Sequence, residues 1–326
     1  MQRSSLILSL VASAAIVAAA GAQPGCSCND ASMMNGEDLS GIVGDGGQTG
    51  DLSGPDLTAP TIDGGVLISD DGGTFVCVQT RCNGKLLACG DCIDNDGDGR
   101  IDFRDPECLG PCDNTEGPVL AAGVGGETGG PCKNDCYFDF GNGSGVDDCT
   151  WDHRCDPLEV GPNYYPEGQS CSYEQSRVGG RDCPATQSTT CQNFCKPLTP
   201  NGCDCFGCCT FPQLPQGQYV WLQSKDSTGN FSCTLADVTN PAKCKPCTPV
   251  PSCFNDCGRC ELCIGKTSLP PDCVASMPDG GTTGSTDMAE QLRCDPGVQP
   301  CGLPTDPECP SGSYCITGCC INSPIF

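Results

Sequence analysis

The chain has 326 residues, of which 34 are Cys, 44 are Gly and 28 are Pro, while aromatic residues make up only 6%. A cysteine content above about 10% is typical of disulfide scaffolds rather than of domains stabilised by a large apolar core. The formal net charge of −25 argues against binding to a phosphate backbone, so nucleic acid is not expected as a partner.

The cysteines between Cys77 and Cys320 number 32, an even count that allows up to sixteen bridges. Each bridge contributes about 2–4 kcal/mol, mainly by restricting the unfolded chain. Disulfides persist only in oxidising compartments, so we expect an exported protein. The predicted fold is a tandem of small disulfide-rich modules, mostly loops with short β-hairpins and little helix.

Residues 1–22 are typical of an export signal, with Arg3, an apolar run over residues 6–20 and an Ala-Gly-Ala cleavage site at residues 20–22. The alternative is a lipoprotein signal over residues 1–25, with the lipid on Cys26. That lipid is the only membrane attachment we expect. Both alternatives predict an extracellular or outer-membrane surface location.

Residues 23–76 are predicted to form a disordered acidic tether, because residues 29–73 contain no Lys or Arg and little apolar surface. The cysteine spacing then divides the chain into four parts. We predict a calcium-loop module at residues 77–112, a cysteine-rich core region at 132–273, a linker at 274–293 and a six-cysteine module at 294–326.

The most informative stretch is residues 94–105, which match a twelve-residue calcium loop. Calcium is bound by six to eight oxygen ligands, and a glycine at position 6 allows the sharp turn around the ion. Gly99 occupies that position. The predicted ligands are the side chains of Asp94, Asp96, Asp98, Asp102 and Asp105, at positions 1, 3, 5, 9 and 12, and the backbone carbonyl of Arg100.

The loop departs from an EF-hand at its end and at its flanks. Asp105 replaces the usual bidentate Glu, Cys92 precedes the loop, and Pro106 and Cys108 follow it. In these features it resembles one thrombospondin type-3 calcium repeat, which implies Ca²⁺ binding next to a disulfide. A bridge between Cys92 and Cys108 would close the loop, although connectivity cannot be deduced from sequence alone.

A second oxygen-rich stretch covers residues 139–148 and contains three glycines. Its spacing matches no known calcium motif, so the alternative is a solvated turn. The candidate ligands are Asp139, Asn142, Asp147 and Asp148.

Regular elements are predicted at two places only. Residues 218–224 and 230–235, joined by residues 225–229, are expected to form a β-hairpin. Residues 185–198 are expected to contain a short helix that ends before Pro200.

The sequence disfavours several other kinds of site. Cys257, Cys260 and Cys263 lack the Cys-Pro that a ferredoxin-type cluster requires, so disulfides are favoured over iron–sulfur ligation. The same holds for zinc or thioredoxin-like chemistry at the pairs Cys89/Cys92, Cys205/Cys208 and Cys244/Cys247. His153 is the only histidine, and no nucleophile elbow is present.

We therefore expect no enzymatic activity. The expected role is structural, adhesive or binding, with an extracellular protein or polysaccharide as partner. Two alternatives from other classes remain, a secreted hydrolase that uses clustered carboxylates and a metal-thiolate or redox protein.

Several segments resemble a family of exported cysteine-rich proteins of soil bacteria. They are CIDNDGDGRIDFRDPEC, CDPLEVGP, PLTPNGCDCFGCC, CELCIGKTSLPPDC and CPSGSYCITGCC. The resemblance implies no established activity. Some members are labelled tryptophan synthase alpha chain, but the alternating strands and helices of that barrel enzyme are missing from this sequence.

Overall fold

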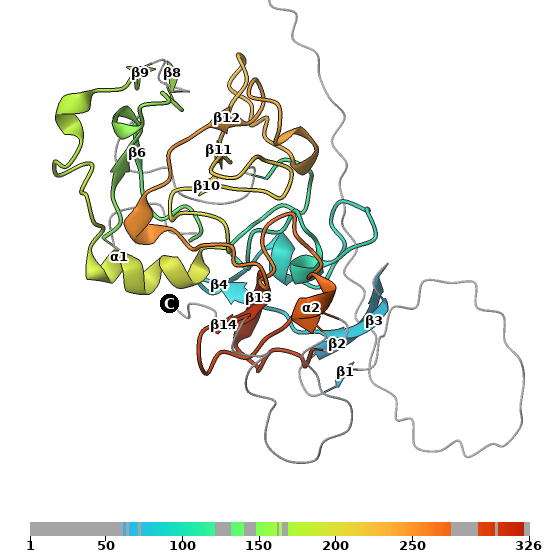
Figure 1. Ribbon diagram of the computed structural model, residues 1–326. Coiled ribbons are helices and arrows are strands. Elements are labelled where there is room, and N and C mark those ends of the chain that lie inside the picture. The colour runs from blue at the N-terminus through green and yellow to red at the C-terminus, as the bar shows by residue number, and fades with distance from the viewer. Residues whose placement is uncertain are drawn as a thin grey trace, which may run out of the picture. The chain divides into compact units, whose positions relative to one another are not determined.

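A computed structural model describes residues 61–62, 65–70, 73–120, 132–139, 148–161, 163–164, 169–274, 293–303 and 306–322 (Figure 1). The predicted export signal, Cys26 and most of the tether and linker lie outside these residues. All 32 cysteines from Cys77 onward lie within them and form sixteen disulfides. The predicted fold class is confirmed, because short antiparallel sheets and little helix accompany these bridges.

Within the described ranges the strands form two three-stranded and four two-stranded antiparallel sheets. The longest pairing joins β2 to β3, from Val66 opposite Cys77 to Asp70 opposite Gly73. The strands are β1 (Thr61–Ile62), β2 (Gly65–Asp70), β3 (Gly73–Cys77), β4 (Arg81–Cys82), β5 (Lys85–Leu86), β6 (Lys133–Asn134), β7 (Trp151–Asp152), β8 (Asn163–Tyr164), β9 (Gln169–Ser170), β10 (Cys208–Cys209), β11 (Val220–Trp221), β12 (Lys245–Pro246), β13 (Ser313–Ile316) and β14 (Cys319–Asn322).

In the part of the chain that the structure describes, helical structure is limited to short turns. The α-helices are α1 (Thr189–Phe194) and α2 (Pro271–Val274), and the 3₁₀ turns are η1 (Ala88–Gly90), η2 (Asp102–Arg104), η3 (His153–Cys155), η4 (Gln175–Arg177), η5 (Lys196–Leu198), η6 (Leu235–Asp237) and η7 (Pro251–Cys253). None of these described helices is long and apolar enough to span a membrane.

The helix predicted within residues 185–198 is present but shorter. It begins where the side chain of Ser188 accepts a hydrogen bond from the backbone N–H of Cys191, which is a standard N-cap. It ends before Pro197, whose ring and missing N–H are incompatible with a helix interior, and η5 completes the segment.

The predicted hairpin of residues 218–224 with 230–235 is wrong in its pairing. Strand β11 pairs instead with β10 and β12, from segments on either side in the sequence. The Cys208–Cys247 disulfide joins these two neighbours and holds them against β11. The two predicted strands are linked only by the isolated bridge between Lys225 and Phe231, which flanks the tight turn of residues 226–230.

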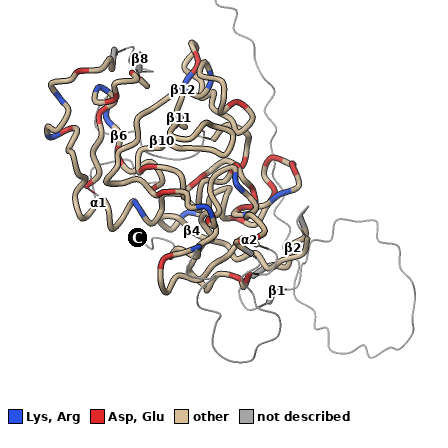
Figure 2. Tube along the Cα trace, viewed as in Figure 1, with Lys and Arg blue, Asp and Glu red and all other residues tan. Residues whose placement is uncertain are grey.

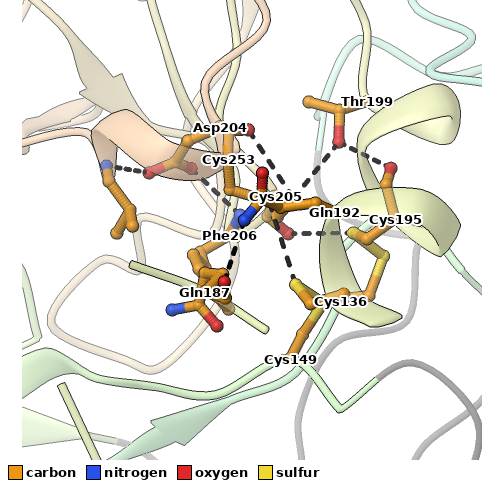
Figure 3. Close-up of a disulfide and its surroundings, with 12 residues drawn as sticks. Cys136, Cys149, Gln187, Gln192, Cys195, Thr199, Asp204, Cys205, Phe206 and Cys253 are labelled. Carbon is orange, nitrogen blue, oxygen red and sulfur yellow. Dashed lines mark hydrogen bonds between the residues drawn. A yellow bond between two sulfur atoms is a disulfide. The ribbon is translucent and has the colours of Figure 1, made fainter. Parts of the chain in front are cut away.

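The core lies in residues 132–273 and is built around disulfides as much as around apolar side chains. Tyr137, Phe138 and Leu222 are buried in one cluster. A second cluster contains the Cys136–Cys195, Cys149–Cys191 and Cys205–Cys253 bridges beside α1. Figure 3 shows this second cluster, where the hydroxyl of Thr199 donates to the backbone carbonyl of Cys195 at 2.9 Å.

Buried carboxylates supply hydrogen bonds that longer strands would otherwise provide. Oδ1 of Asp204 accepts the backbone N–H groups of Phe206 at 3.0 Å and Cys208 at 2.9 Å, and Oδ2 accepts that of Val250 at 2.7 Å. Burial raises the pKa of Asp204 to about 7, because the charged form loses its hydration. Asp204 therefore folds its own turn and ties it to the segment that contains Val250, at an electrostatic cost.

Each disulfide closes within one of three segments. Three bridges lie in residues 77–112. Ten lie in residues 132–273. Three lie in residues 294–320. The three segments are therefore joined to one another only by the peptide chain and by non-covalent contacts.

Candidate calcium site

The first half of the predicted loop is folded by its own carboxylates. Asp94 accepts two backbone N–H groups, from Gly97 at 2.7 Å and from Gly99 at 3.1 Å. Asp96 accepts that of Asp98 at 3.0 Å, and Asp98 accepts that of Arg100 at 2.9 Å. These local turns wrap the backbone around the side-chain oxygens.

Gly99 adopts the conformation that its position in the loop requires. Its φ of +93° lies in the left-handed region, which glycine adopts at little cost. Gly97 also has a positive φ, of +80°. The turn predicted at position 6 is therefore formed.

The structure brings the carboxylates of Asp94, Asp96 and Asp98 together. One oxygen from each lies within 4.8 Å of the other two; Asp94 is half-buried, and Asp96 and Asp98 are exposed. Figure 2 marks the acidic residues in red along the Cα trace. Calcium binds oxygen at about 2.3–2.6 Å, so ligands around one ion lie up to about 5 Å apart. The spacing of the three carboxylates is compatible with one shared ion.

Asp105, at position 12, is only 2% exposed. Its Oδ1 accepts the backbone N–H of Glu107 at 2.7 Å, whereas Oδ2 is buried without a hydrogen-bond partner among the described residues. Burial, followed by the side chain of Glu107, raises the pKa of Asp105 to about 8, and the charge of Asp98 makes a smaller contribution to the same shift. A calcium ion could satisfy a buried carboxylate oxygen of this kind, although the group formed by Asp94, Asp96 and Asp98 does not itself include Asp105.

Asp102, at position 9, makes contacts outside the loop, and its predicted role as a ligand stays a prediction. It is 1% exposed, and its Oδ2 accepts the backbone N–H of Cys92 at 3.0 Å. Burial, followed by the neighbouring charge of Glu116, raises its pKa to about 8. The residue adopts a φ of +50° in this arrangement. Asp102 thus fastens the loop to the chain that precedes it.

Glu116 was missed by sequence reasoning. Its Oε2 accepts the backbone N–H of Asn95 at 2.6 Å, and its Oε1 accepts that of Asp102 at 2.7 Å. The residue is 2% exposed, and burial raises its pKa. No loop motif marks Glu116, because it lies beyond the twelve-residue repeat.

The predicted pairing of Cys92 with Cys108 is wrong. Cys92 is bonded to Cys77, and Cys108 is bonded to Cys89. The Cα atoms of these pairs are 5.8 and 5.6 Å apart, the usual separation for a disulfide. The loop is therefore closed by a cysteine three positions earlier than expected, while Cys92 holds it to β3.

The second predicted site is described only at its two ends. Asp139 is buried, and Asp148 is exposed with a φ of +58°. Asn142 and Asp147 lie outside the described residues. The structure therefore provides no geometry for a site made of these four residues.

The cysteine pairs considered for metal or redox chemistry are all oxidised. In every Cys-x-x-Cys pair both cysteines are bonded to partners outside the pair, as in Cys205–Cys253 and Cys208–Cys247. Cys257 and Cys263 are bonded to each other, and Cys260 is bonded to Cys273. A disulfide sulfur is not a thiolate, so these bridges offer no thiolate ligands.

His153 is packed in the interior. Its Nε2 lies 3.1 Å from Oδ1 of Asn134, and its ring meets that of Trp221 edge to face at 4.5 Å. Burial lowers its pKa to about 4, so the imidazole is neutral near pH 7.

Comparison of the chain with protein-family models, curated proteins and solved structures found no match. The class of protein therefore follows from the chain itself. It is a disulfide-rich protein whose cysteine pairing indicates an oxidising, extracellular environment.

Proposed function

We propose that this is an exported, calcium-stabilised scaffold with a structural, adhesive or binding role at a cell surface or in a matrix. The observation that carries the proposal is the convergence of Asp94, Asp96 and Asp98 on one point, with the unpaired Oδ2 of Asp105 nearby. Oxidised cysteines support the extracellular part of the proposal.

The proposed ligands are the side chains of Asp94, Asp96, Asp98 and Asp105 and the backbone carbonyl of Arg100. Asp102 accepts the backbone N–H of Cys92, which precedes the loop. Glu116 accepts the backbone N–H groups of Asn95 and Asp102 within the loop. An ion that binds only the native loop stabilises the native state to a degree set by its concentration relative to its Kd. Calcium would act here as a structural ligand rather than as a catalyst.

The expected partner is an extracellular protein or a polysaccharide. The short elements and long loops held by bridges suit a display scaffold better than a rigid catalytic cleft. Contact with a membrane would be made only through a lipid on Cys26. No nucleic-acid partner is proposed, because the net charge is −25.

The test is thermal unfolding of the full-length protein with calcium and with a chelator. Asp96→Ala combined with Asp98→Ala should abolish the calcium-dependent rise in Tm. Asp226→Ala is a matched control, because Asp226 closes an exposed turn elsewhere by accepting N–H groups from Thr228 and Asn230. A calcium shift that survives the double substitution would remove this loop as the binding site.

A further inference from the structure

The C-terminal segment, residues 294–320, packs directly on the predicted calcium loop. Phe103 of η2 stands between two aromatic rings, Phe75 of β3 and Tyr314 of β13. The ring centroids are 5.8 and 6.1 Å apart, and both pairs meet edge to face. Such contacts stabilise an interface beyond the burial of area alone. Phe103 thus connects the loop to the C-terminal segment through edge-to-face aromatic contacts.

The side chain of Tyr314 is buried close to acidic residues of the calcium-loop module. Tyr314 is 5% exposed, and its hydroxyl has no hydrogen-bond partner in the described part of the chain. Its pKa is raised by burial and then by the charges of Asp102, Asp113, Glu116 and Asp105. The buried hydroxyl of Tyr314 is therefore within the electrostatic influence of the residues that hold the loop.

Asp102 and Tyr314 also line one cavity of about 200 Å³ between β3, η2 and the C-terminal segment. Oδ1 of Asp102, like the phenol, lacks a hydrogen-bond partner among the described residues. The cavity has room for water beside these two polar groups. The segment and the loop therefore share a cavity as well as the aromatic contacts.

On its other side the segment rests on the core. The hydroxyl oxygen of Thr317 accepts the backbone N–H of Asn201 at 3.0 Å. Gly318 packs so closely that a Cβ there would lie 3.2 Å from Leu262. The three disulfides of the segment are internal to it, so these contacts and the loop determine where it sits.

We propose that the C-terminal segment is a calcium-dependent clamp, with Tyr314 as a positioning residue that holds η2 in the calcium-binding conformation. This inference rests on the proposed calcium site. Without the ion, the adjacent carboxylates of Asp94, Asp96 and Asp98 repel one another, which loosens the loop that carries Phe103. Coupling between two binding events is reciprocal, so calcium also holds the segment in place.

The first test measures the calcium Kd of the full-length protein by titration calorimetry. Tyr314→Ala should raise the Kd roughly tenfold, within the usual range of such couplings. Tyr219→Ala is the matched control, because Tyr219 makes an equivalent edge-to-face contact with Phe254 at 5.5 Å. Its Kd should equal that of the wild type.

Tyr314→Phe keeps the ring and removes only the hydroxyl. It should bind calcium more weakly than the wild type and more tightly than Tyr314→Ala. If Tyr314→Ala does not form all of its disulfides, Tyr314→Phe takes its place in the calcium titration. A wild-type Kd in Tyr314→Phe would reject the polar part of the clamp.

The second test uses hydrogen exchange at the backbone amide of Asn201, which reports contact with Thr317. Chelation of calcium should speed this exchange roughly tenfold in the wild type, on the scale of the same coupling. If the wild type binds calcium, yet the Kd of Tyr314→Ala and the exchange at Asn201 are both unchanged, the clamp is overturned and the calcium site stands. A wild type that binds no calcium overturns both.

Discussion

The carboxylate of Glu116 accepts the backbone N–H of Asp102 at 2.7 Å, a contact that spans 14 positions of the chain. Its second oxygen accepts the backbone N–H of Asn95 at 2.6 Å. One side chain thus holds the start and the end of the loop at a fixed separation. Residues 94–100 contain no apolar side chain that could do so by packing, since Ile101 is the first buried apolar residue of the loop.

Glu116→Gln should therefore weaken the loop while barely changing the size of the side chain. An amide offers one acceptor oxygen in place of two, and its NH₂ group would face a buried N–H. The expected loss is about 1–3 kcal/mol of unfolding free energy. Chemical unfolding with and without calcium would measure it, with Glu174→Gln as a control at a half-exposed ion pair with Arg177. Equal losses in the two variants would contradict the assignment.

Asp98→Asn and Asp102→Asn should distinguish a calcium ligand from a residue that only supports the loop. Asp98 belongs to the converging triad, so removal of its charge should raise the calcium Kd about tenfold or more, the scale typical of a metal-site substitution. In Asp102→Asn the new amide keeps a carbonyl oxygen that can accept the N–H of Cys92, so this variant should raise the calcium Kd less than Asp98→Asn does. Calorimetric titration of both variants is the measurement. A reversed order would restore Asp102 as a ligand.

The Cys89–Cys108 bridge should matter for calcium binding more than bridges elsewhere. Replacing both cysteines with Ala frees the two ends of the loop, so more entropy must be lost when it closes around the ion. The calcium Kd should rise. Replacement of Cys233 and Cys244, bonded 11 positions apart in the core region, is the control and should leave the Kd unchanged.

Stability without calcium should fall as the pH rises from about 4 to about 8. Burial raises the pKa of both Asp113 and Asp204 from 3.8 to about 7 in the folded protein. Between these values the native state keeps protons that the unfolded chain has lost, so each increase in pH favours unfolding. The pKa of Asp102, raised to about 8, extends the same trend, so the loss is complete only well above about pH 8. Tm measured at about pH 5 and about pH 8 in a chelator should show this decrease.

Asp204→Asn should reduce the difference in Tm between the two pH values, because it removes one of the buried carboxyl groups that titrate in this range. Asp226→Asn should not, since Asp226 is exposed and its pKa is lowered by a hydrogen bond from the Thr228 side chain. A Tm that is higher at the alkaline pH than at the acidic one would show that other groups dominate.

The sequence allowed the local part of the site to be predicted because that part is encoded locally. Asp94, Asp96 and Asp98 bond to backbone groups only two to five positions away, and Gly99 supplies the turn. The fixed spacing of these residues in the sequence is therefore enough to predict the geometry of this part of the loop. The abundance of bridges and the scarcity of helix likewise follow from composition.

The remaining features depend on contacts between distant residues. Glu116 reaches the loop from outside its repeat, and the partners of Cys92 and Cys108 are set by how β3 and η1 fold against it. Strand β11 pairs with β10 and β12, which are held by a bridge that joins Cys208 to a position 39 residues later. Neither spacing nor periodicity contains that information.

The confinement of every disulfide to its own segment has a consequence for how the chain matures. Six cysteines allow 15 pairings, far fewer than a pool of 32 would allow. As the chain emerges into an oxidising compartment, residues 77–112 contain all the partners they need before residue 132 appears. Correct pairing can then proceed one segment at a time, so an error in one segment does not consume a cysteine from the next.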